Sequence, residues 1–145
     1  MADKYLTAEQ KAAIGVWSEP YTTVIESGAI RRFAEAIGDT NPIHAAGLVA
    51  PPTFLVTLRS GAPRVNPERP RGVGGVDGGR EYEYLKPIKA GDRITATSRL
   101  ADIYERSGRT GDMILTIMET IYHNQDGELV AIGRATGITR MTVVS

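Results

Sequence analysis

The chain contains no cysteine among its 145 residues. This absence excludes disulfides, thiolate metal sites and a cysteine nucleophile, and it fits a reducing compartment. Charge of neither sign predominates, because Lys+Arg and Asp+Glu number 17 each. A nucleic-acid partner or an anionic membrane partner is therefore not expected.

Long apolar runs are also absent, so no segment is expected to span a bilayer. The first twenty residues carry charges that the apolar core of a signal peptide would not tolerate: Asp3, Lys4, Glu9, Lys11 and Glu19. The length and the 41% hydrophobic content fit one ordinary globular domain over residues 1–145. We therefore expect a cytoplasmic protein.

The first third of the chain contains two helix signals with a strand between them. Thr7-Ala8-Glu9-Gln10 has the form of a capping box and predicts a helix over residues 8–15. The β-branched run at 21–25 predicts a short strand. Ser27 is then expected to cap a helix whose apolar positions follow at spacings of three and four: Ile30, Phe33, Ala34 and Ile37. Arg31, Arg32 and Glu35 fall off this apolar face, and Gly38 stands where a left-handed C-terminal cap belongs.

A second, fully buried helix is expected over residues 51–59, which begin with two prolines and continue with few polar side chains. The glycine-rich, proline-rich and arginine-rich stretch from Gly61 to Gly79 is expected to be a loop. Its segment GVGGVDGG superficially resembles a nucleotide-binding loop, but Asp77 replaces the third glycine and no strand-then-helix context surrounds it.

Beyond this loop the pattern predicts four strands, at 80–88, 93–105, 112–123 and 128–141, separated by turn signals. The last strand places a row of small residues on one face: Ala131, Gly133, Ala135 and Gly137. Such a row indicates the close approach of another backbone, which a buried helix would supply. We therefore predict an α+β hot-dog fold, a curved antiparallel sheet wrapped around a buried central helix.

The sharpest candidate site is Asp39-Thr40-Asn41-Pro42-Ile43-His44, directly after the predicted helix. Asp39 and His44 are five positions apart and would lie up to about 17 Å from each other in an extended chain, but an Asn-Pro turn folds the loop so that both side chains can converge. A carboxylate and an imidazole suit acid and base roles near neutral pH. The same residues also fit a purely structural turn in which Asp39 only accepts a hydrogen bond.

These residues resemble the signature of (R)-specific enoyl-CoA hydratases and MaoC-like dehydratases. The segments Ile30–Gly38, Val49–Phe54 and Leu85–Asp92 resemble the same family, in family order, so the similarity extends from about Tyr21 onward. The resemblance implies that Asp39 and His44 are a catalytic pair holding one water molecule, which adds syn to a trans-2-enoyl thioester or leaves the (R)-3-hydroxyacyl form. Coenzyme A is the expected carrier, and no metal and no cofactor apart from coenzyme A in the substrate are expected.

The resemblance also implies a substrate-binding region at Asn41 and at the start of the buried helix. A backbone N–H there would stabilise the negative charge on the thioester oxygen. The chain departs from the family here, because Pro51 and Pro52 have no N–H and the family usually has a glycine. Thr53 or Phe54 is therefore the expected donor. Four arginines could instead meet coenzyme A phosphates but are expected to be solvated: Arg59, Arg64, Arg69 and Arg71.

Two other functions remain open. A hot-dog acyl-CoA thioesterase usually carries its carboxylate near the central helix, whereas residues 52–60 contain no Asp or Glu. The Ala50–Phe54 stretch also resembles tunnel-shaping partner subunits of heteromeric MaoC-like dehydratases. Because a single hot-dog sheet exposes a long edge, a homodimer or a hot-dog heterodimer is expected, with each site near the subunit boundary.

Overall fold

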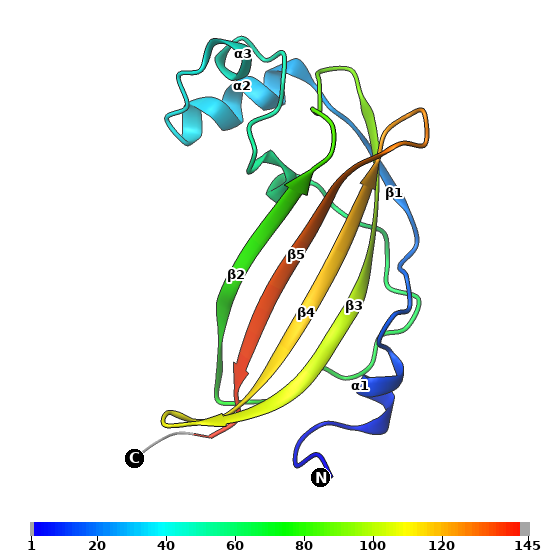
Figure 1. Ribbon diagram of the computed structural model, residues 1–145, viewed down its shortest axis with the longest axis vertical. Coiled ribbons are helices and arrows are strands. Elements are labelled where there is room, and N and C mark those ends of the chain that lie inside the picture. Colours follow the sequence, from blue (N-terminus) through cyan, green and yellow to red (C-terminus); the bar gives the residue numbers. More distant parts are fainter. Residues whose placement is uncertain (1, 143–145) are drawn as a thin grey trace.

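A computed structural model describes residues 2–142, in which five strands form one curved antiparallel sheet (Figure 1). The strand order is β1-β3-β4-β5-β2, so the consecutive strands β3, β4 and β5 form a meander with β1 and β2 at its two edges. The strands are β1 (Tyr21–Val24), β2 (Gly74–Tyr84), β3 (Arg93–Gly108), β4 (Gly111–His123) and β5 (Leu129–Arg140). The predicted α+β hot-dog class, with its curved antiparallel sheet, is confirmed.

The helices are short and lie outside the sheet. They are α1 (Ala8–Ala12), α2 (Ser27–Ala36), α3 (Pro42–Ala45) and the 3₁₀ helix η1 (Phe54–Thr57). The predicted capping box is present, since the Thr7 side chain accepts from the Gln10 N–H while the Gln10 side chain accepts from the Thr7 N–H. In contrast, α2 begins one residue earlier than predicted, because Ala29 and Ile30 both donate to the carbonyl of Glu26.

The loop predicted from Gly61 to Gly79 is a loop over residues 61–73, but its glycine-rich end from Gly74 belongs to strand β2, which corrects that part of the prediction. From Gly74 onward it pairs with β5, with a register shift between Asp77 and Gly79. A Cβ at Gly78 would lie 3.0 Å from the side chains of both Ile138 and Thr136, so the glycine leaves room for the neighbouring strand's side chains. The segment therefore forms an edge strand in spite of the low strand propensity of glycine.

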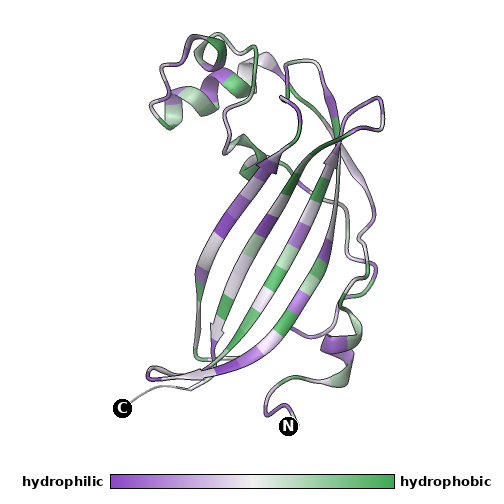
Figure 2. Ribbon diagram, in the orientation of Figure 1, coloured by the Kyte–Doolittle hydropathy of each residue, from purple (hydrophilic) through white to green (hydrophobic). Residues whose placement is uncertain are grey.

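The inner face of the sheet, defined here by Ile94, Ala96, Tyr122 and Ala131, carries the core. Phe54 and Leu55 of η1 pack against this face together with residues that follow β1, and all of them are buried. Figure 2 shows the matching alternation of hydrophobic and hydrophilic residues along the strands. Period-two patterning thus places the core on one side of the sheet.

The predicted buried helix over 51–59 is reduced to the four-residue η1. Its bonds run from Phe54 N–H to Pro51 O, and from Leu58 N–H to Leu55 O, which is a 3₁₀ pattern. Leu58 is already extended at φ −85°, ψ 141°, and Gly61 follows within three residues. The burial of Phe54 and Leu55 agrees with the prediction, whereas the helix length does not.

The small-residue row on β5 also differs from its expected role. At Gly133 a Cβ would lie 3.0 Å from the ring of Tyr82, a side chain of the adjacent strand β2. At Gly137 the nearest atom to such a Cβ is the carbonyl oxygen of Thr116, at 4.0 Å. The row therefore accommodates a tyrosine ring at one point and leaves space at another, and η1 is too short to cover its whole length.

Helices α2 and α3 lie together beyond one end of the sheet, and α1 lies near the other (Figure 1). The T-shaped contact of Phe33 with Phe54, with ring centroids 5.5 Å apart, joins α2 to η1 and so to the core. Among residues 2–142, no helix has the length and hydropathy needed to span a membrane.

Leu55 and Val56 are neighbours on η1 with opposite surroundings, since Leu55 is 1% exposed and Val56 is 47% exposed. Leu55→Ala should lower the free energy of unfolding by about 2–5 kcal/mol through the lost burial and the cavity left behind. Val56→Ala is the matched control and should change it by no more than about 0.5 kcal/mol. Urea titrations of the three proteins measure both values, and equal losses would contradict the proposed position of the core.

Candidate active site

A hydrogen-bonded cap holds Asp39 at the end of α2. Gly38 has φ +70°, a conformation that glycine adopts without strain, and its N–H donates to Glu35 O at 3.1 Å. The N–H of Asp39 donates to Ala34 O at 2.8 Å. Together these bonds form a Schellman motif, so the chain turns sharply and carries Asp39 away from the helix axis.

The next turn positions His44. Asn41 is the N-cap of α3, its Oδ1 accepting from the Ile43 N–H at 3.3 Å, and Pro42 occupies the first helical position. The His44 N–H donates to Asn41 O at 3.0 Å, which closes the turn. The single turn of α3 therefore reverses the chain and brings the imidazole back toward Asp39.

The structure brings Asp39 and His44 into direct contact. The distance from Asp39 Oδ2 to His44 Nδ1 is 2.7 Å, and the two side chains are 21% and 12% exposed. Asp39 Oδ1 accepts from the Asn41 N–H at 2.9 Å. Any water molecule shared by the pair must therefore bind through His44 Nε2 and the remaining carboxylate lone pairs.

The carboxyl group of Asp39 is held in its ionised form. The backbone hydrogen bond from Asn41 is the main cause that lowers the pKa of Asp39 below 3.8, and the hydrogen bond from His44 adds to it. With Asp39 ionised, His44 Nδ1 carries the proton that the carboxylate accepts, so Nε2 is left as the basic nitrogen. The pair thus has the arrangement of an imidazole base oriented by a carboxylate.

A hollow of about 540 Å³ borders Asp39 on the α2 side. Its lining consists of Gly28, Arg31, Arg32, Glu35, Asp39, Thr40 and Ala45. From the sequence, the two arginines were expected only to lie off the apolar face of the helix. No spacing could have linked them to Asp39, because the Schellman turn takes that residue out of the helix.

The other predicted substrate-binding residues lie on or next to η1. Phe54 is buried against Phe33, and its N–H already donates to Pro51 O at 2.9 Å. Thr53 is the N-cap of η1, and its own N–H has no backbone acceptor among the residues described. Of the two expected oxyanion donors, the Thr53 N–H is therefore the one that is free to bind a substrate oxygen.

A second hollow, of about 590 Å³, lies beneath the other end of the inner face. It is covered by α1 and by the loop 60–70, and its floor includes Ala135 and Gly137. The loop is fastened to the N-terminal segment by a bond from Gln10 Nε2 to Glu68 O at 2.6 Å and by one from Glu19 N–H to Ala62 O at 2.9 Å. The space left by the absent long helix is thus partly enclosed.

Comparison with known proteins decides the family. A family model described as "FAS1-like, dehydratase domain region" matches residues 12–132. The chain belongs to this FAS1-like dehydratase family. The match agrees with the MaoC-like hot-dog family predicted from the sequence.

The chain is also similar to proteins named UPF0336. It is 33% identical over 130 residues to a UPF0336 protein of Streptomyces griseus, covering 77% of this chain and 82% of the relative. A UPF0336 protein of Parafrankia is 38% identical over 129 residues, with coverages of 78% and 82%.

Two solved structures share the fold of this chain. The ChsH1-ChsH2 complex from Mycobacterium tuberculosis has a TM-score of 0.70 at 23% identity and covers 93% of this chain and 89% of its own. The R-hydratase PhaJ1 from Pseudomonas aeruginosa has a TM-score of 0.58 at 20% identity, with coverages of 90% and 84%. At these identities the two likenesses establish the hot-dog fold.

The lowered pKa of Asp39 makes a prediction about stability. The hydrogen bonds to the ionised carboxylate stabilise the folded state above the unfolded-state pKa of 3.8, and this contribution is lost as the pH falls through the lower folded-state pKa. Asp39→Asn should therefore lower the Tm at neutral pH, and its Tm should converge on that of the wild type as the pH falls below 3.8 and through the folded-state pKa of Asp39. Thermal unfolding at a series of pH values measures the difference.

Asp126→Asn is the control, because the carboxylate of Asp126 has no hydrogen bond or ion pair among the described residues. It should give a Tm difference that is small at every pH. If the Tm difference between wild type and Asp39→Asn stayed constant down to acidic pH, the charge of Asp39 would contribute nothing to the stability of the folded state.

Proposed function

We propose that this member of the dehydratase family interconverts a trans-2-enoyl thioester and its (R)-3-hydroxyacyl form, with Asp39 and His44 as the catalytic pair. The observation that carries the proposal is the 2.7 Å contact between Asp39 Oδ2 and His44 Nδ1, together with the hollow of about 540 Å³ that Asp39 lines. The family match and the likeness to an R-hydratase support the same class of reaction. Coenzyme A is the proposed carrier.

In the hydration direction, His44 Nε2 takes a proton from water while the water oxygen bonds to the β-carbon. The electron pair of the alkene moves toward the thioester carbonyl, and the α-carbon then receives a proton from the imidazolium. Asp39 stabilises the imidazolium by its charge and its fixed position. Because water and proton are delivered from one side of the substrate, the addition is syn.

Charge that develops on the thioester oxygen needs a donor. The Thr53 N–H meets that need in the proposal, since the Phe54 N–H is already used within η1. An oxyanion donor is typically worth about 3–4 kcal/mol to the transition state. Asn41 contributes through its backbone and side chain, which hold Asp39 and cap α3.

His44→Ala and Asp39→Asn should each lower kcat for the hydration of crotonyl-CoA by at least ~10², since each removes or disorients the proton carrier. Chromatography of the 3-hydroxyacyl product measures the reaction directly. His123→Ala, at the end of β4, is the control and should keep wild-type turnover. Release of free coenzyme A by the wild type would instead indicate a thioesterase.

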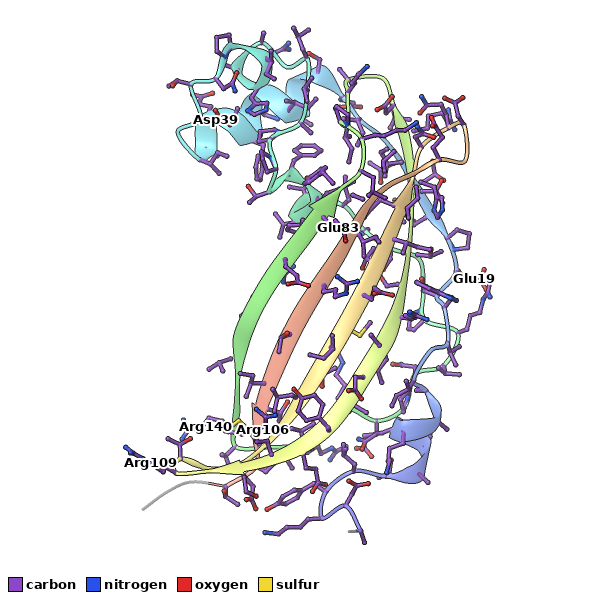
Figure 3. All side chains as sticks on the ribbon, in the orientation of Figure 1. Glu19, Asp39, Glu83, Arg106, Arg109 and Arg140 are labelled. Carbon is purple, nitrogen blue, oxygen red and sulfur yellow. The ribbon has the colours of Figure 1, made fainter. Side chains whose placement is uncertain are left out.

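A second candidate function is a subunit that shapes the acyl site of a heteromeric dehydratase. The hollow beneath the inner face favours it, because this space lies at the end of the sheet remote from Asp39 (Figure 3). Two of the similar structures are complexes by name, ChsH1-ChsH2 and HadBC of Mycobacterium tuberculosis. Hydration of crotonyl-CoA by the purified chain alone would argue against a partner-only role.

Association with a second hot-dog subunit is proposed through β2. Its eleven residues pair with β5 on one side only, and residues 74–81 are exposed throughout. An unpaired edge of this length favours pairing with another strand. Light scattering at micromolar concentration should therefore give the mass of a dimer.

Val76→Lys should shift this dimer toward the monomer, because Val76 lies on the β2 edge and is 54% exposed. Val24→Lys is the matched control on the opposite edge strand, where Val24 is 50% exposed. Dissociation by Val24→Lys and not by Val76→Lys would assign the contact to β1 instead.

A further inference from the structure

Two arginine side chains converge on one point of the hollow beside Asp39. A Cβ placed on Gly28 would lie 3.2 Å from Arg32 Nη1 and 3.7 Å from Arg31 Nη2. The two guanidinium nitrogens are therefore no more than about 7 Å apart, by the triangle inequality applied to these two contacts. Neither arginine has a carboxylate within ion-pair distance among the described residues, although Glu35 lines the same hollow.

Local contacts hold the Arg31 side chain in this position. Arg31 Nη1 donates to Ser27 Oγ at 2.9 Å, which fixes the guanidinium over the first turns of α2. The turn that follows α3 presses on the same side chain, since a Cβ at Gly47 would lie 2.9 Å from Arg31 Cγ. The segment that carries His44 thus packs directly against the stem of Arg31.

Gly28 has no reason to be present on helix stability alone, because glycine in a helix costs about 0.5–1 kcal/mol relative to alanine. A Cβ there would meet the end of the Arg32 side chain at 3.2 Å, a tight contact that the guanidinium could relieve only by moving. Two cations held together repel each other, and an anion between them removes that repulsion. The small residue beside the two guanidinium groups leaves room for such an anion.

We propose that Arg31 and Arg32 bind the 4′-phosphate at the end of the pantetheine arm of the substrate. This inference rests on the proposed function, because it assigns the carrier end of the thioester to the hollow that borders Asp39. Coenzyme A and acyl carrier proteins both present this phosphopantetheine group.

The length of the hollow matches this group. Helix α2 has ten residues and is therefore about 15 Å long, and the hollow is lined from Gly28 in its first turn to Asp39 beyond its last turn. An extended covalent chain advances about 1.2 Å per bond, so the roughly thirteen bonds from the thioester sulfur to the phosphorus span about 16 Å. With a phosphate over Gly28, the pantetheine arm is therefore long enough to bring the thioester to Asp39.

The experiment compares the binding of 4′-phosphopantetheine and pantetheine, which differ only in the phosphate, by isothermal titration calorimetry. Wild type should bind the phosphorylated compound at least ~10-fold more tightly, and the double variant Arg31→Gln/Arg32→Gln should lose that preference. Arg106→Gln/Arg109→Gln, at the opposite end of the sheet (Figure 3), is the matched control and should retain it. Equal binding of the two compounds by wild type would overturn the proposal, as would an unchanged preference in the Arg31/Arg32 variant.

Coenzyme A in the same titration distinguishes the sources of the phosphate. An equal loss for coenzyme A and 4′-phosphopantetheine in the double variant assigns the site to the 4′-phosphate that both carriers share. A larger loss for coenzyme A assigns it to the adjoining nucleotide phosphate, and no loss for coenzyme A overturns the proposal.

Kinetics separate this inference from the proposed function. The Arg31→Gln/Arg32→Gln variant should raise KM for crotonyl-CoA with little change in kcat. The crotonyl thioester of N-acetylcysteamine has no phosphate, so the variant and the wild type should have the same kcat/KM for it. An equal loss with both substrates would mean that the arginines serve the fold and not the phosphate. If the wild type hydrates neither thioester, the proposed function fails, and the titrations still decide the phosphate site.

Discussion

The edge-to-face contact between Phe33 and Phe54 connects the two parts of this molecule. Phe54 belongs to the core on the inner face of the sheet, whereas Phe33 belongs to α2, which lies beyond the end of that sheet. Aromatic pairs of this geometry are worth about 0.5–1.5 kcal/mol beyond the area they bury. Ile30 of α2 is itself fully buried in that core, so the position of α2, and with it that of Asp39 and of both arginines, depends on the contacts of Phe33 and Ile30 together.

From that fixed helix, short-range hydrogen bonds determine the rest of the site. The Schellman cap directs the chain out of α2, Asn41 caps the single turn of α3, and the carboxylate of Asp39 accepts from both the backbone and His44. Every one of these bonds joins residues no more than five apart in the sequence. Little chain entropy is lost in closing such short loops, so the pair can form with great local precision once α2 is in place.

This locality explains which features could be read from the sequence. Gly38, Asn41 and Pro42 each have one strongly preferred position around a helix end, so the convergence of Asp39 and His44 was predictable from the six residues alone. The sheet was predictable for a similar reason, because period-two patterning and turn residues define β3, β4 and β5.

The sequence predictions that were wrong concern segments whose structure depends on contacts with distant parts of the chain. An apolar run at 54–58 fits a buried helix as well as a 3₁₀ turn. The choice depends on partners such as Tyr84, whose hydroxyl donates to Pro52 O, and Ile88, whose carbonyl accepts from Ala50 N–H. Likewise, the glycine-rich segment forms a strand because β5 pairs with it, and the side chains of Ile138 and Thr136 occupy the space beside Gly78. No pattern within either segment contains that information.

Because η1 is short, loop 60–70 and not a helix covers the remaining part of the inner face. Pro63, Pro67 and Pro70 restrict the backbone and prevent a regular helix, so this segment crosses the inner face as an irregular strap. A helix in that position would fill the sheet's curvature with its own side chains, whereas the strap is tied down at its edges by Gln10 and Glu19 and leaves the middle open. The row of Ala135 and Gly137 then faces empty volume instead of a packed helix. Replacing a helix with a proline-rich strap therefore converts core volume into cavity volume, while the short η1 keeps enough apolar contact to hold α2 and its catalytic candidates at the far end.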